Sequence, residues 1–129
     1  MRKLLIPALL GLVVALPAEA RPRPYNPVAI VKNWYRQYLH REPESSGIQG
    51  WVDQLRQGED PTYLLSVLLA DKEYYQNAGK TPKGWIAALY EDLAGRAPTR
   101  REMRYWLNRL EEQTYQEVAY ALLRKFGGG

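Results

Sequence analysis

The stretch LHREPESSGIQGWVDQL at residues 39–55 returns in altered form as AGRAPTRREMRYWLNRL at residues 94–110. Each stretch lies between two segments in which apolar residues recur every three or four positions, which is the spacing of a helix face. The chain is therefore expected to contain the same helix–loop–helix unit twice. Four residue types recur at an offset of 55 positions: Arg41 with Arg96, Pro43 with Pro98, Trp51 with Trp106, and Leu55 with Leu110.

Helix start signals punctuate the chain, whereas strand signals are missing. Asn26, Asp60 and Thr81 are each followed by proline, the pattern of an N-cap and a first helical residue. Thr99 and Thr114 each precede a glutamate by three positions, the spacing of a capping box. The sequence has no run of alternating β-branched residues and no Asn-Gly turn. We expect six helices with these core-facing positions: Val28, Val31, Trp34, Tyr35, Tyr38, Leu39; Ile48, Trp51, Val52, Leu55; Leu64, Leu65, Val67, Leu68, Tyr75; Ile86, Leu89, Tyr90, Leu93; Met103, Trp106, Leu107, Leu110; and Val118, Ala121, Leu122, Phe126.

The six helices form two trios within a helical domain at residues 27–126. Repeat one covers residues 27–76 and repeat two covers residues 82–126. The first two helices of each trio align at an offset of 55, and the third helices align at 54. One copy of such a unit buries its apolar side poorly alone, whereas two copies cover each other. The sequence thus predicts an all-α fold, a tandem duplication of a three-helix unit that shares one core.

Residues 1–20 have the features of a secretory signal peptide. Two basic residues precede an apolar run over residues 4–16, and Ala18-Glu19-Ala20 offers a small-residue cleavage site. The alternative is a membrane anchor, but the run is shorter than the roughly 20 residues of a spanning helix. We expect cleavage after Ala20 and export to the periplasm or the exterior, with no stable membrane span afterwards.

The composition of the chain excludes several classes of function. It has no cysteine and one histidine, so the usual Cys/His zinc sites cannot form, and we expect no metal, cofactor or catalytic residue. The net charge of +4 is spread along the chain, and Arg100, Arg101 and Arg104 are the nearest approach to a basic stripe. Because nucleic-acid binding favours a concentrated stripe, we expect no nucleic-acid partner. Residues 21–26 are expected to form an extended, proline-stiffened arm and residues 127–129 a flexible tail.

The repeated loop is expected to have a structural role. Arg41 and Arg96 follow a helix end, where a guanidinium bonds free carbonyls or pairs with a carboxylate of a neighbouring helix. A role for both arginines in ligand binding is the alternative. Pro43 and Pro98 push the preceding residue out of helical geometry and so fix the loop.

The tryptophans divide into two groups. Trp34 and Trp85 each adjoin another apolar residue, Tyr35 and Ile86, so one member of each pair should lie toward the edge of its stripe. We therefore treat Trp34 and Trp85 as candidate partner-binding residues. The other tryptophans and the leucines that follow them lie on the stripes and are assigned to the core: Trp51, Leu55, Trp106 and Leu110.

The segment YRQYLHREPESSGIQGWVDQL at residues 35–55 resembles the bacterial family called domain of unknown function 4214. Members read Y-R-x-L-x-R-x-P-D-x-x-G-x-x-x-W, followed by a helix that ends in Ser/Asp-x-Glu-Tyr. DKEY at residues 71–74 looks like this ending. In the first motif, Glu44 stands where the family has the aspartate after the proline. Residues 84–126 look like a divergent second copy, in which Glu102 replaces the glycine and the ending is absent. The resemblance implies a helical module of exported or surface-associated bacterial proteins, with no catalytic residues.

Three functions are compatible with these observations. The first is a non-catalytic interaction module that binds a protein or the cell envelope, favoured by the repeat and by ten tyrosines and four tryptophans. The second is binding of cell-wall glycans through exposed aromatic side chains. The third is a glycan hydrolase, which needs two carboxylates across one cleft. Its candidates are Glu91, Asp92 and Glu102, but adjacent residues do not face each other on a helix.

Overall fold

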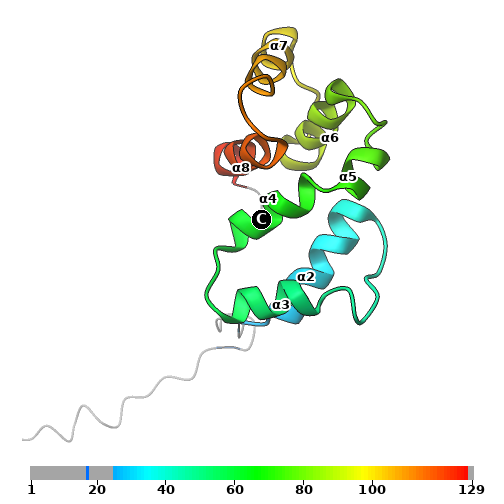
Figure 1. Ribbon diagram of the computed structural model, residues 1–129, viewed down its shortest axis with the longest axis vertical. Coiled ribbons are helices and arrows are strands. Elements are labelled where there is room, and N and C mark those ends of the chain that lie inside the picture. Colours follow the sequence, from blue (N-terminus) through cyan, green and yellow to red (C-terminus); the bar gives the residue numbers. More distant parts are fainter. Residues whose placement is uncertain (1–16, 18–24, 128–129) are drawn as a thin grey trace, which may run out of the picture.

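The computed structural model describes residues 17 and 25–127, and this part of the chain is all-helical (Figure 1). The predicted signal peptide, apart from residue 17, lies outside the described residues, as do most of the arm and the last two residues of the tail. Seven α-helices and one π-helical turn are formed between residues 25 and 127: α2 (Pro27–Trp34), η2 (Tyr35–Leu39), α3 (Gln49–Arg56), α4 (Pro61–Leu69), α5 (Lys72–Asn77), α6 (Pro82–Ala94), α7 (Arg100–Arg109) and α8 (Tyr115–Phe126).

Five of the seven α-helices between residues 25 and 127 begin where their capping residues predict, the exceptions being α3 and α5. The side chains of Asn26, Asp60 and Thr81 each accept a hydrogen bond from a backbone N–H of the first turn, and proline follows each of them. Thr99 and Thr114 form complete capping boxes with glutamates three positions later. These bonds satisfy N–H groups that have no partner within the helix, which is why such local signals were reliable.

The third predicted helix is two helices. A single helix was expected to extend to Tyr75, but α4 ends at Leu69, and Asp71 has extended backbone angles before α5 begins. The indole N–H of Trp85 donates to the carbonyl oxygen of Leu69 at 2.8 Å. This bond satisfies a carbonyl at the end of α4 from a distant part of the chain, so the break depends on tertiary contacts. After the break, Tyr74 is buried rather than Tyr75.

The first predicted helix contains a π-helical turn. α2 continues into η2 without a break, and the N–H of His40 donates to the carbonyl of Tyr35. Because a π turn holds more residues than an α turn, neighbouring residues can both face inward. His40 ends the turn in the left-handed conformation at φ 55°, and Gly95 does the same at φ 70° after α6.

One hydrophobic cluster draws residues from both predicted repeats. α4 and α8 make the most extensive contact between helices, and they lie between α2 and α3 at one end and α6 and α7 at the other (Figure 1). Leu65 and Leu69 of α4 and Leu122 and Leu123 of α8 are fully or almost fully buried. The expected common core is therefore present.

The four residues assigned to the core all contact it, to different extents. Leu55 and Trp106 are buried. Trp51 and Leu110 are partly buried and pack against the cluster from its margin.

Candidate functional site

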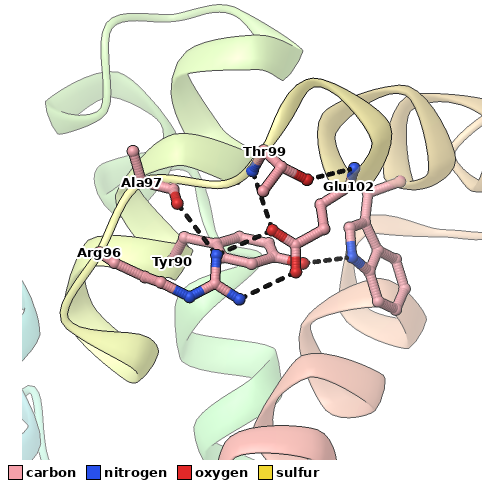
Figure 2. A network of polar contacts seen from close by, with 6 residues as sticks. Tyr90, Arg96, Ala97, Thr99 and Glu102 are labelled. Carbon is pink, nitrogen blue, oxygen red and sulfur yellow. Dashed lines mark hydrogen bonds and ion pairs between the residues drawn. The ribbon is translucent and has the colours of Figure 1, made fainter.

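The second copy of the repeated loop is held by a network around Glu102 (Figure 2). Arg96 donates to both oxygens of the Glu102 carboxylate, at 2.8 and 2.9 Å, and to the carbonyl of Ala97 at 3.1 Å. The backbone N–H of Thr99 donates to the same carboxylate at 2.8 Å. Arg96 first, and the Thr99 N–H second, lower the pKa of Glu102 from 4.5 to about 2.

Aromatic side chains connect this network to the core. The guanidinium of Arg96 lies over the ring of Tyr90, 5.4 Å from its centroid. The indole N–H of Trp106 donates to the Tyr90 hydroxyl at 2.8 Å (Figure 2). Tyr90 is fully buried, so its hydroxyl needs this partner. The loop is thereby fixed to α6 and α7 at once.

The first copy of the loop uses the same arginine with a different carboxylate. Arg41 lies over Tyr35 at 5.1 Å and donates to the carbonyl of Glu42 at 3.1 Å, as Arg96 does to Tyr90 and Ala97. Its ion pair, however, is with Glu73 of α5, at 2.7 and 2.9 Å. The pKa of Glu73 is lowered by this hydrogen bond. Both arginines thus fix loops, and Pro43 and Pro98 are partly buried within them.

The candidate partner-binding tryptophans are buried, which corrects the expectation from sequence. Trp34 is 2% exposed and Trp85 is 0% exposed. Trp34 precedes the π-helical turn, where Tyr35 is buried beside it. Trp85 lies on α6, which contacts α5, α7 and α8 and so buries a wide arc of its surface. The stripe argument assumed one covered side for each helix, and α6 has more than one.

The exposed surface of α7 is polar and carries three arginines. We call the five exposed side chains of this helix the α7 face: Arg100, Arg101, Arg104, Tyr105 and Asn108. Tyr105 is 51% exposed and meets the edge of Trp106 with ring centroids 4.9 Å apart. The three ion pairs found between residues 25 and 127 involve Arg36, Arg41 and Arg96, and none involves an arginine of this face.

Two grooves flank the α7 face. The α6–α7 groove, of about 490 Å³, is lined by Lys83, Pro98, Thr99, Arg100, Met103, Arg104 and Leu107. The α7–α8 groove, of about 380 Å³, is lined by Tyr90, Arg101, Glu102, Tyr105, Trp106, Ala121 and Lys125. Both combine apolar with cationic side chains, a composition found in binding grooves.

Two of the three carboxylates considered for hydrolysis, Asp92 and Glu102, have other partners. Asp92 accepts a hydrogen bond from the Tyr74 hydroxyl at 2.7 Å. Burial, and then this bond to a carboxylate, raise the pKa of Tyr74. Glu91 and Asp92 line a pocket of about 220 Å³ together with His40. Glu102 is on another helix and is occupied by Arg96 and Thr99, so its carboxylate serves as a cap, as its sequence position indicates.

Sites for metals and membranes were also sought within the described part of the chain. No three His, Asp or Glu side chains there lie close enough together to hold a metal ion. No helix there has the length and apolar character needed to cross a bilayer. Comparison of the chain with protein-family models, curated proteins and solved structures finds no match.

The arginines of the α7 face were identified from the sequence as a basic cluster but were not assigned to a binding site. Their cluster was visible, but the grooves beside them were not. The spacing of Met103 and Leu107 indicated a core stripe, whereas both are partly buried and also line the α6–α7 groove. A groove depends on how far apart two helices lie, which no local pattern specifies.

Proposed function

We propose that this chain is an exported, non-catalytic interaction module that binds another protein or a component of the cell envelope through the α7 face. The observation that carries the proposal is the pair of grooves on either side of a helix with exposed arginine and tyrosine side chains. Arginine and tyrosine are enriched at protein interfaces because they combine large contact area with polar tips.

The exposed aromatic side chains favour a protein partner over a glycan. The large hydrophobic residues exposed between residues 25 and 127 are Tyr25, Tyr63 and Tyr105, which come from three different segments. Tyr63 meets Tyr120 of α8 edge to face, and Tyr105 meets Trp106 in the same way. A glycan platform would need several free rings on one surface.

Export, the duplication and the family resemblance belong to the same proposal. In both loops the helix ends at a residue in the left-handed conformation, and the arginine that follows lies over a tyrosine ring. In both loops this arginine also donates a hydrogen bond to the backbone carbonyl of the next residue. This agreement supports a duplication whose copies have since diverged. The signal-like residues 1–20 support delivery outside the cytoplasm.

Site-specific cross-linking tests the proposed surface. A photoreactive phenylalanine analogue replaces Tyr105 in one variant and Gly50 in another, because position 50 is the counterpart of 105 at the repeat offset and is also exposed. We expect position 105, and not position 50, to cross-link a discrete protein in bacterial envelope extracts. Equal products at both positions would contradict the proposal. A change in tryptophan fluorescence on adding soluble wall glycans, without a protein product, would favour glycan binding.

A further inference from the structure

The rim of the α6–α7 groove carries uncompensated positive charge. Lys83 of α6 and Arg100 and Arg104 of α7 line it, and none of them takes part in an ion pair between residues 25 and 127. By contrast, Arg36, Arg41 and Arg96 each have a carboxylate within 2.9 Å.

These charges are placed where they disfavour the fold. Arg100 and Arg101 occupy the first turn of α7, where the helix dipole disfavours cations. Arg100 and Arg104 are four residues apart, so they are neighbours of like charge on the helix surface. The counterparts of Arg100, Arg101 and Arg104 in the first repeat are Ser45, Ser46 and Gln49, so the fold of the unit does not need a cation there.

The floor of the groove restricts the kind of anion that fits. Pro98, Met103 and Leu107 form its apolar part. A free phosphate or an acidic polysaccharide would satisfy the arginines but would leave this floor uncovered. A polypeptide segment with alternating acidic and apolar side chains satisfies both, because carboxylates match the planar guanidinium groups and an apolar side chain covers the floor.

The chain itself does not supply such a segment outside its described residues. Before Tyr25 its charged residues are Arg2, Lys3, Glu19, Arg21 and Arg23, four basic and one acidic, and residues 128–129 are glycines. These terminal residues therefore do not supply the complementary acidic charge.

We propose that the α6–α7 groove docks an acidic amphipathic segment of a partner protein. Carboxylates of the segment pair with Arg100, Arg104 and Lys83, and one apolar side chain packs on Met103 and Leu107. The inference rests on the proposed function, because it assigns a partner chemistry to one side of the α7 face.

Peptide binding tests this assignment directly. The probe is a fluorescein-labelled helical peptide of about 18 residues with glutamate on one side and leucine on the other. Fluorescence anisotropy compares the full chain with an R100S/R104Q variant, which installs the first repeat's residues. We expect the variant to bind the peptide about tenfold more weakly and to be at least as thermostable, because a like-charge pair is removed. Raising the salt from about 50 to 300 mM should weaken binding to the unmodified chain.

Control probes define the result that would overturn the inference. A peptide with lysine in place of glutamate, and one with glutamine in place of leucine, should each bind much more weakly than the probe. Equal binding of the probe by the variant would overturn the inference. So would tighter binding to vesicles of anionic lipid than to the peptide, or a dimer of the chain alone that is lost in the variant. If position 105 cross-links a partner but the probe does not bind, the interaction function stands and the acidic assignment fails. If the probe binds but position 105 cross-links no partner, the acidic assignment of the groove stands and the proposed interaction function fails.

Discussion

Glu102 acts as both a helix cap and an ion-pair partner. Its carboxylate accepts from the Thr99 N–H and from two nitrogens of Arg96. The ion pair is partly open to solvent, since the Arg96 side chain is 47% exposed and that of Glu102 is 24% exposed. Solvent screening therefore keeps its contribution modest, but both bonds favour the ionised form. The network thus makes local stability depend on pH.

An E102Q variant should lose part of this acid dependence. The folded pKa of Glu102, about 2, lies below its ordinary value of 4.5. The ionised carboxylate therefore stabilises the fold fully above pH 4.5, and that contribution is lost as the pH falls through 2. Glutamine can still accept from Thr99, so the variant removes mainly the charge. We expect its Tm, measured by circular dichroism, to be lower at pH 7 and to converge with the unmodified chain near pH 2.

The control for this prediction is E112Q, because Glu112 is exposed and makes no ion pair within residues 25–127. Its Tm should follow that of the unmodified chain at every pH. If the curves of E102Q and the unmodified chain stay parallel down to pH 2, the Arg96–Glu102 pair contributes no pH-dependent stability.

At the scale of elements, the helices differ in how closely their neighbours approach. Gly84 lies in the first turn of α6, where an added Cβ would lie 2.3 Å from the carbonyl oxygen of Ala78 and 3.0 Å from the Thr81 hydroxyl. Gly50 lies in α3 with nothing within 4 Å of such an atom. Gly84 therefore permits the close approach of the Ala78 backbone to α6, whereas Gly50 permits no close contact and lowers the helix propensity of α3.

Alanine at these two glycines should have opposite effects. G50A should raise the free energy of unfolding by about 0.5–1 kcal/mol, because alanine favours the helix. G84A should lower it by about 1–3 kcal/mol, because the backbone of Ala78 must move. Urea unfolding measures both. Stabilisation by both substitutions would show that the end of α5 does not pack against α6 as described.

Helix starts with a side-chain cap were predictable from sequence, whereas interruptions within helices were not. A cap is a bond between residues two or three positions apart, so Thr99 and Thr114 reveal it locally. The break after Leu69 depends on Trp85, sixteen positions later, and the burial of Trp85 depends on three neighbouring helices. The arginines of the α7 face could be read as a cluster, but their groove could not, because it is formed between two helices.

At the scale of the whole molecule, the two predicted repeats depend on each other through α4 and α8. Leu64 and Leu65 of α4 and Val118 and Leu122 of α8 are at most 1% exposed. Gln116 of α8 also donates to the Ser66 hydroxyl of α4 at 2.8 Å. Neither set of apolar side chains would be covered without the other, so the chain should unfold as one unit.

An L122A variant tests this cooperativity. The substitution should cost about 2–5 kcal/mol, because it leaves a cavity in the common core. Amide hydrogen exchange should accelerate in α2 and α3 as much as in α6 and α7, although Leu122 is on the last helix described. E112A, at an exposed turn, should change exchange in neither half. Unchanged protection of α2 and α3 in L122A would mean that the halves unfold separately.

The pairing of α4 with α8 also affects how the chain is made. Contacts between these helices join residues about fifty positions apart, as Ser66 and Gln116 are. At a synthesis rate of about 5–20 residues per second, the ribosome needs roughly 3–10 s to reach α8 after completing α4. During that interval the leucines of α4 have no permanent cover. We therefore expect the nascent chain to stay loosely folded until residue 126 has left the exit tunnel and α8 can cover α4.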